Sequence, residues 1–273
     1  MTDNTATAWT PDDAAACIAV PGEHDDKYSR GVLGVITGST MYPGAAVLGV
    51  EAAAHTGIGM IRYLGEAVTL VLQRRPEVVT ADGRVQAWLL GSGMDHVDRE
   101  LEPLLKALDQ GVPAVLDGGA LDLYDRARGP VVITPHQGEL ARLLDVPRER
   151  IAADPGGFAR RTADELGVTV LLKGHTTHIA GPDISLSAAA APTWLATAGA
   201  GDALAGILGA LVATHAHEIA ADPAELARLA ATAAVVHGLA AARASGGGPL
   251  TILDLAAALP ATIAAVLAGA HRS

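Results

Sequence analysis

An aspartate preceded by two nearby glycines stands just before the most apolar helical stretch of this 273-residue chain. Gly199, Gly201 and Asp202 come directly before residues 203–212, whose aliphatic and small side chains predict a buried helix. The first amides of a helix have no intrahelical partner, and the helix dipole adds positive charge, so such an end can bind phosphate. Asp202 could then act as a general base or as a metal ligand. An ordinary turn with Asp202 as a plain helix cap is the alternative.

Further polar residues follow short apolar stretches elsewhere in the chain. Asp117 could hold a metal ion or a substrate hydroxyl, or could only bind the amides of its own turn. His136 could contact a substrate or carry a proton, because an imidazole titrates near neutral pH, or could only bind a carbonyl. Lys173 needs an anionic partner if it is buried, either a phosphate or an internal carboxylate. Glu139 is expected at least to cap the helix that begins there.

The apolar stretches predict the strands of a largely parallel sheet, because helical stretches alternate with them. The predicted fold class is α/β, with a doubly wound, mostly parallel sheet and helices on both faces. In such a sheet ligands bind beyond the carboxyl ends of the strands, so the polar residues should converge there with Asp202. The predicted strands are 32–37, 60–64, 87–90, 113–116, 131–133 and 168–172, and a hairpin is predicted over 176–180 and 184–186.

The rest of the chain is predicted to be mostly helical. Residues 1–29 are expected to be a lead-in segment, with structure beginning at Gly31, and residues 30–273 a single domain without a linker. Asp222 and Pro223 predict the start of a helix that continues to residue 243, because proline favours the first helical position after a cap. Thr251 is expected to cap the last helix. Earlier helices are predicted from about residue 45 to 55, over 98–110 and over 158–166.

The composition excludes several classes of function. The net charge of −11 argues against a nucleic-acid-binding surface, which is normally basic. A single cysteine, Cys17, excludes an intrachain disulfide framework and fits a reducing cytoplasm. The first residues lack the basic and apolar regions of a signal peptide, and no uninterrupted apolar run reaches membrane-spanning length. The histidines lack the spacing of a metal site, so no protein metal site is predicted.

Several short motifs stand in a characteristic order along the chain. With them, the chain resembles the ADP/ATP-dependent NAD(P)H-hydrate dehydratases, a branch of the ribokinase-like superfamily, from about Lys27 to its end. A Thr-Pro-His-x-Gly-Glu motif followed by Leu-Lys-Gly is more specific than Gly-x-Gly-Asp alone. The motifs are Gly38-Ser39, Tyr42-Pro43-Gly44-Ala45, Gly91-Ser92-Gly93, Leu116-Asp117, Thr134-Pro135-His136-Gln137-Gly138-Glu139, Leu172-Lys173-Gly174 and Gly199-Ala200-Gly201-Asp202.

The resemblance implies a ribokinase-like α/β/α sandwich and a lyase that repairs nicotinamide nucleotides. Such enzymes dehydrate the hydrates NADHX and NADPHX: ADP or ATP phosphorylates the ring hydroxyl, which leaves as phosphate, and bacterial members generally convert ADP to AMP. Mg²⁺ would bridge the phosphates, and Asp202 would take the hydroxyl proton. By resemblance, the hydrated dinucleotide would contact Ala45, Gly93, His136 and Asp202, and the adenine nucleotide would contact Lys173, Gly174, His175, Thr176, Thr177 and Gly201.

The resemblance also implies a homo-oligomer, typically a tetramer, and it predicts that the epimerase that many bacterial relatives carry is a separate protein. The sequence departs from the family pattern in three places. The usual Gly-Thr-Gly-Asp reads Gly199-Ala200-Gly201-Asp202, as in sugar and vitamin kinases of the superfamily. The usual Asp-Ala-Asp-Ala-Leu-Asn reads Asp117-Gly118-Gly119-Ala120-Leu121-Asp122, without the second carboxylate and the asparagine. The usual glycine-rich approach to Gly199 is replaced by Ala191-Pro192-Thr193-Trp194.

Two other functions remain open at this point. An ATP-dependent kinase for a thiazole alcohol, a pyrimidine alcohol or a sugar would keep Asp202 as the base and the same phosphate-binding helix end. A non-catalytic nucleotide-binding module would bind adenine nucleotide without turnover. The presence of both Lys173 and Asp202 favours an enzyme, and no residue in the sequence distinguishes ADP from ATP or NADHX from NADPHX.

Overall fold

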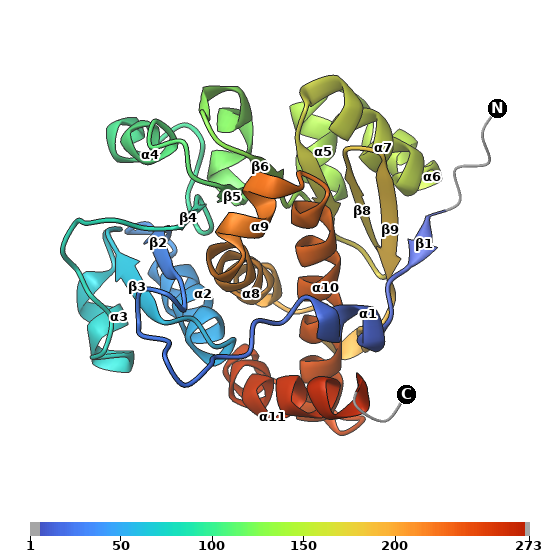
Figure 1. The fold of residues 1–273 in the computed structure, drawn as a ribbon. Helices are drawn as coiled ribbons and strands as arrows, with labels where there is room; N and C mark the ends of the chain where they lie inside the picture. Colours follow the sequence, from blue (N-terminus) through green and yellow to red (C-terminus); the bar gives the residue numbers. More distant parts are fainter. Residues whose placement is uncertain (1–5, 271–273) are drawn as a thin grey trace.

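A nine-stranded sheet runs through the middle of the molecule (Figure 1). The computed structural model describes residues 6–270. The strands lie in the order β1-β9-β8-β7-β6-β5-β4-β2-β3. Their bounds are β1 Thr7–Ala8, β2 Val32–Ile36, β3 Met60–Tyr63, β4 Ala87–Leu90, β5 Ala114–Leu116, β6 Val131–Ile133, β7 Thr169–Leu172, β8 Thr177–Gly181 and β9 Ile184–Ala188.

Strand direction determines where the polar loops meet. Every neighbouring pair is parallel except β7–β8 and β8–β9, so β8 alone is reversed. The chain passes from β2 outward to β3 and then returns to place β4 on the other side of β2. This reversal of strand order creates a crevice between the loops after β2 and β4, the place where open α/β sheets bind ligands.

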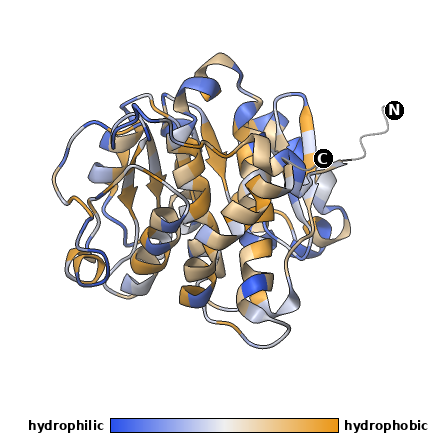
Figure 2. Cartoon of the chain, turned by 60° about the horizontal axis from the view of Figure 1, so that its bottom comes forward, coloured by the Kyte–Doolittle hydropathy of each residue, from blue (hydrophilic) through white to orange (hydrophobic). Residues whose placement is uncertain are grey.

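Helices cover both faces of the sheet, as predicted. One face carries α2 (Pro43–His55), α8 (Ala200–Thr214) and α10 (Glu225–Ser245), and α3 (Val68–Arg74) and α11 (Ile252–Ala270) lie beside them. The other face carries α4 (Leu101–Leu108), the 3₁₀ segment η1 (Gly118–Arg126), α5 (Gln137–Leu143), α6 (Arg148–Ala153) and α7 (Pro155–Leu166). Apolar side chains of the strands alternate between the two cores, and the strands are mostly orange in Figure 2.

Helix α8 is held in the core by very close packing against α2. A Cβ atom on Gly206 would overlap the carbonyl oxygen of Gly49. No larger residue fits at this crossing without displacing a helix, so glycine sets the distance between α2 and α8. Eleven of the fifteen residues of α8 are buried, which agrees with the predicted buried helix.

Two predictions of where regular structure begins are wrong. Regular structure begins before Gly31: β1 extends the sheet edge beside β9, and α1 (Pro11–Ala16) starts at a Thr10–Asp13 capping box. The helix predicted to start at Asp222 starts at Glu225, because Asp222 instead accepts a hydrogen bond from the amide of Ala224.

Other predictions for the helices are confirmed in part. Thr251 caps α11, since its hydroxyl accepts a hydrogen bond from the amide of Asp254. The helix predicted over 98–110 is shorter, from Leu101 to Leu108, and the short helices α3 and α9 (Ala216–Ala221) were not predicted. The hairpin over 176–186 is present as β8 and β9. Cys17 is buried, which raises the pKa of its thiol.

Two helices are long and apolar enough to cross a membrane by length and composition alone. In α10, 78% of the most apolar stretch is buried inside the fold, so this helix belongs to the core. In α11 the corresponding share is 33%.

Candidate functional site

The loops after β2 and β4 meet at the crevice of the sheet. The amide of Gly38 donates to the carbonyl of Ser92 over 2.7 Å. Gly93 has φ +68°, and a Cβ atom on it would overlap the side chain of Ala45, in the first turn of α2. Ala45 and Gly93, both predicted to contact substrate, therefore adjoin each other, and the absence of a side chain at Gly93 keeps the crevice open.

Asp117 lies at the end of β5 and is the hub of a buried polar network. Its carboxylate accepts hydrogen bonds from Ser92 Oγ at 2.8 Å, Thr134 Oγ1 at 2.7 Å and Lys173 Nζ at 2.8 Å. Burial alone would raise the pKa of Asp117, but the charge of Lys173 and these three hydrogen bonds hold it below its usual value. The carboxylate thus ties together the ends of β4, β5, β6 and β7 rather than only the amides of its own turn.

Lys173 follows β7, and its amide donates to the carbonyl of Pro135 over 2.8 Å, which continues the β6–β7 pairing. Its side chain is 18% exposed and lies 3.7 Å from Glu139 Oε2 as well as beside Asp117. Burial opposes its charge, but Asp117 and Glu139 outweigh burial and raise the pKa of Lys173. Of the two partners left open by the sequence, the structure shows the internal carboxylate.

Asp202 lies in the first turn of α8 but is not the residue that caps it. The cap position is Gly199, whose φ of +89° suits glycine, and it makes no side-chain capping bond. The plain-cap alternative for Asp202 is therefore wrong. Within residues 6–270, no hydrogen bond to the Asp202 carboxylate is formed. Burial, with Asp117 and Glu139 nearby, raises its pKa to about 6, although Lys173 opposes the shift.

Lys173 and the start of α8 are close neighbours. A Cβ atom on Gly201 would lie 3.3 Å from Lys173 Nζ. The ammonium group and the free amides of the first helical turn therefore face the same space, and together they form an anion-binding corner beside the Asp202 carboxylate.

His136 occupies the cap position of α5. Its Nδ1 accepts hydrogen bonds from the amides of Gly138 at 2.9 Å and Glu139 at 3.1 Å, and the amide of His136 donates to Glu139 Oε2 at 2.7 Å. Nδ1 is therefore an acceptor, which leaves any proton on Nε2, and the ring is 56% exposed. Glu139 both closes the cap, as predicted, and adds negative charge beside Lys173.

A cavity of about 180 Å³ opens between the end of β7, the start of β8, α8 and α10. Lys173, Gly174, His175, Thr177 and Gly201 line it, so five of the six predicted nucleotide contacts share one pocket. Thr176 is not among the lining residues, and its role remains a prediction. Apart from His237, the rest of the lining is apolar and is formed by Ala188, Ala190, Ala191, Leu195, Ala200, Leu204 and Ala234.

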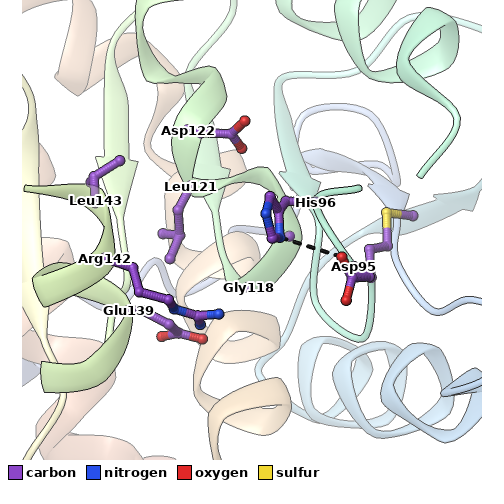
Figure 3. A pocket seen from close by; sticks show the side chains of 10 residues that line it. Asp95, His96, Gly118, Leu121, Asp122, Glu139, Arg142 and Leu143 are labelled. Atoms are coloured by element: carbon purple, nitrogen blue, oxygen red, sulfur yellow. Dashed lines mark ion pairs between the residues drawn. The ribbon is translucent and has the colours of Figure 1, made fainter. Parts of the chain in front are cut away.

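Two larger cavities are lined by other loops and helices. One of about 310 Å³ lies between η1, α5 and the loop after β4, and Glu139, Arg142 and His96 surround it in Figure 3. The second, of about 480 Å³, lies between the loops after β2, β3 and β4. Met94 and Asp95 line both, so the two cavities adjoin. They share no lining residue with the 180 Å³ pocket and offer room for a long ligand.

The residues that the sequence analysis missed are those that hold or surround the predicted ones. Ser92 and Thr134 were quoted only within motifs, although both bind Asp117. His237 was not considered, because it lies within a long apolar helical stretch. In the part of the chain that the structure describes, no group of three or more His, Cys, Asp or Glu side chains could hold a metal ion.

Comparisons with known proteins place these features in a family. A family model described as NAD(P)H-hydrate dehydratase matches residues 33–260. A bifunctional NAD(P)H-hydrate repair enzyme of Mycobacterium leprae is 45% identical over 74% of this chain, but the match spans 45% of that protein's length. An ADP-dependent (S)-NAD(P)H-hydrate dehydratase of Neisseria meningitidis is 34% identical over 70% of this chain and 72% of its own.

The fold comparison agrees with these sequence matches. The crystal structure of an ADP/ATP-dependent NAD(P)H-hydrate dehydratase from Bacillus subtilis, co-crystallised with ATP and Mg²⁺, superposes with a TM-score of 0.86. The match covers 96% of this chain and 99% of the other, at 25% sequence identity. The ribokinase-like fold predicted from the sequence is therefore confirmed.

Proposed function

Because this chain belongs to the NAD(P)H-hydrate dehydratase family, we propose that it restores NADH and NADPH from their hydrates by ADP-dependent dehydration. The chain spans about half the length of the Mycobacterium leprae relative, so activity is proposed for this part of such a protein. The observation that carries the proposal is the Asp202 carboxylate, free of hydrogen bonds within residues 6–270, beside Lys173 and the first turn of α8.

The reaction requires a phosphoryl group to move from ADP to the ring hydroxyl of the hydrate. Asp202 takes the hydroxyl proton as the hydroxyl oxygen bonds to the β-phosphorus, and AMP leaves. The C–O bond of the phosphorylated ring then breaks and inorganic phosphate departs. The neighbouring ring carbon releases a proton to solvent, and the C=C bond that forms restores the dihydronicotinamide. Because phosphoryl transfer depends mainly on positioning and charge neutralisation, the reaction needs a base, groups that position the phosphates and a cation that neutralises their charge.

The two sides of the crevice fit the two ligands. The 180 Å³ pocket leads to Lys173 and Gly201 and would hold the adenine nucleotide with its phosphates at the start of α8. The adjoining 310 Å³ and 480 Å³ cavities would hold the hydrated dinucleotide, with Ala45, Gly93 and His136 at the crevice between. Asp202, beside Lys173 and Glu139, would then act where the two ligands meet.

Mg²⁺ fits the donors that are present. It commonly binds one or two carboxylates together with substrate phosphates, rather than a cage made only of protein. Asp202 has a free carboxylate, and Glu139 lies across the same corner. When bound, Mg²⁺ would neutralise charge on the transferred phosphoryl group, and these two residues would orient it.

We further propose a cytoplasmic homotetramer that acts together with an epimerase. Two exposed large apolar groups on the late part of the chain, Trp194 and Leu253, support self-association. The single cysteine supports a reducing compartment. The bifunctional relatives support a coupling of two activities in hydrate repair. Light scattering after gel filtration would measure the subunit number.

The test is the recovery of NADH absorbance from purified protein, hydrated NADH, Mg²⁺ and either ADP or ATP. A nucleotide-dependent rise would establish the repair reaction and identify the phosphoryl donor. The absence of a rise with both nucleotides, in protein shown to bind ADP, would refute the proposal. A screen of alcohol substrates would then test the kinase alternative.

A further inference from the structure

One buried side chain in the 180 Å³ pocket has no role in the family motifs. His237 lies on α10 and lines the pocket together with Ala234, from the same helix, and Lys173. It is 6% exposed, and its Nε2 has no hydrogen-bond partner within residues 6–270. A buried polar atom without a hydrogen-bond partner destabilises the folded protein, so its presence in the pocket needs an explanation.

The surroundings of His237 determine its charge. Burial lowers the pKa of the imidazole to about 4, a hydrogen bond between the ring and the backbone of Ala200 opposes this shift, and the charge of Lys173 adds to it. The ring is therefore neutral at physiological pH, with one nitrogen that donates and one that accepts. The atom without a partner is Nε2. A neutral ring adds no charge for phosphates, which already have Lys173 and the first turn of α8.

The lining of the pocket indicates which part of a nucleotide reaches His237. Lys173 and Gly201 are its phosphate-binding groups, and most of the remaining lining is apolar, formed by alanines, Leu195 and Leu204. A flat aromatic base suits an apolar wall, whereas a polyphosphate does not. A turn of the imidazole about its own bond would present a nitrogen to a base or a ribose seated there.

We propose that His237 is a recognition residue that binds the nucleoside part of the phosphoryl donor by a hydrogen bond from its imidazole ring. The inference rests on the proposed function, because it takes the donor to be an adenine nucleotide. Binding of the nucleoside gives the ring nitrogen the partner it lacks in the free protein. His237 thereby separates recognition of the base and ribose from the phosphate binding at Lys173.

The experiment compares ADP and pyrophosphate binding, each with Mg²⁺, by titration calorimetry. The variants are His237→Leu, which removes the hydrogen bond, and His237→Gln, which keeps a donor and an acceptor. His215→Leu is the matched control, because His215 is also buried but lies at the opposite end of α8. We expect ADP to bind about tenfold more weakly to His237→Leu, the usual effect of one lost hydrogen bond. His237→Gln should bind ADP nearly as the wild type does, and pyrophosphate affinity should be unchanged in every variant.

The outcomes separate this inference from the proposed function. Unchanged ADP affinity in His237→Leu, or an equal loss of ADP and pyrophosphate affinity, would overturn the inference alone. A wild-type protein that binds no ADP would overturn the proposed function and the inference with it. If His237→Leu does not fold, spectra of wild-type protein with ¹⁵N-labelled histidine decide: the His237 ring signals must shift with ADP and not with pyrophosphate, and a shift with both refutes the role.

Discussion

Replacing Asp202 with Asn should abolish most turnover and, at the same time, stabilise the protein. Asparagine keeps the shape of the side chain but cannot accept the hydroxyl proton. Loss of a general base typically lowers the rate by about 10²- to 10⁴-fold. Binding of the hydrate should change little, so the loss should appear in kcat rather than in the KM for the hydrate.

The gain in stability follows from the raised pKa of Asp202. Its pKa moves from 3.8 to about 6 on folding, because burial and the charges of Asp117 and Glu139 disfavour the carboxylate. The folded protein therefore holds the proton more tightly than the unfolded chain, and stability falls as the pH rises between these values. About two pH units correspond to about 3 kcal/mol, an upper limit because the side chain is only partly buried.

Thermal unfolding of both proteins at several pH values measures this effect. The Asn variant should melt several degrees higher than the wild type above pH 6, at roughly 2–4 °C per kcal/mol for a chain of this size. The difference should shrink as the pH falls from 6 towards 4, where Asp202 becomes neutral in both states. Near-full activity in the variant would refute the catalytic role. An unchanged melting temperature at high pH would refute the electrostatic reasoning.

Three further results are expected. The rate should rise with pH and level off above about pH 6, as Asp202 loses its proton, in a profile of kcat/KM against pH; a flat profile down to pH 5 would contradict this. Lys173→Met should destabilise the protein by about 3–5 kcal/mol, because it leaves the buried Asp117 charge unpaired. In the double variant that also carries Asp117→Asn, chemical denaturation should show that much of that stability is restored. The double variant should still be inactive. Gly206→Ala should cost about 1–3 kcal/mol by forcing α8 away from Gly49, and an unaltered unfolding midpoint would show that the helices can separate freely.

The strands could be predicted because each buried strand carries a run of apolar residues that ends at a polar loop. The loops at Gly38, Gly91, Asp117 and Lys173 follow strands, and parallel pairing brings all four to one edge of the sheet. The edge strand β1 could not be predicted in the same way. Its two residues pair with β9, whose position depends on the whole order of the sheet.

The partners within the site depend on tertiary contacts that sequence spacing does not reveal. Asp117 and Lys173 are 56 residues apart, and whether Lys173 faced a carboxylate or a phosphate stayed open in the sequence. Position 119 is a second example. A Cβ atom on Gly119 would lie 2.5 Å from the carbonyl oxygen of Met94, so the carboxylate typical of the family does not fit this backbone. The departure from the family pattern is therefore a packing requirement that appears only in the folded chain.

The charges around the anion-binding corner lead to a prediction about how ADP binding depends on Mg²⁺. Three carboxylates, those of Asp117, Glu139 and Asp202, lie around the ammonium group of Lys173. The formal charge of these four groups together is −2. At low local dielectric such an excess repels the phosphates of ADP, despite the free amides of α8. A cation that arrives with the nucleotide removes the excess, so ADP should bind much more weakly after chelation of Mg²⁺. Calorimetry with and without EDTA measures this, and Asp202→Asn should reduce the dependence because it removes one negative charge. Equal ADP affinity in both buffers would mean that Lys173 and the helix end suffice alone, and that the carboxylates do not oppose the nucleotide.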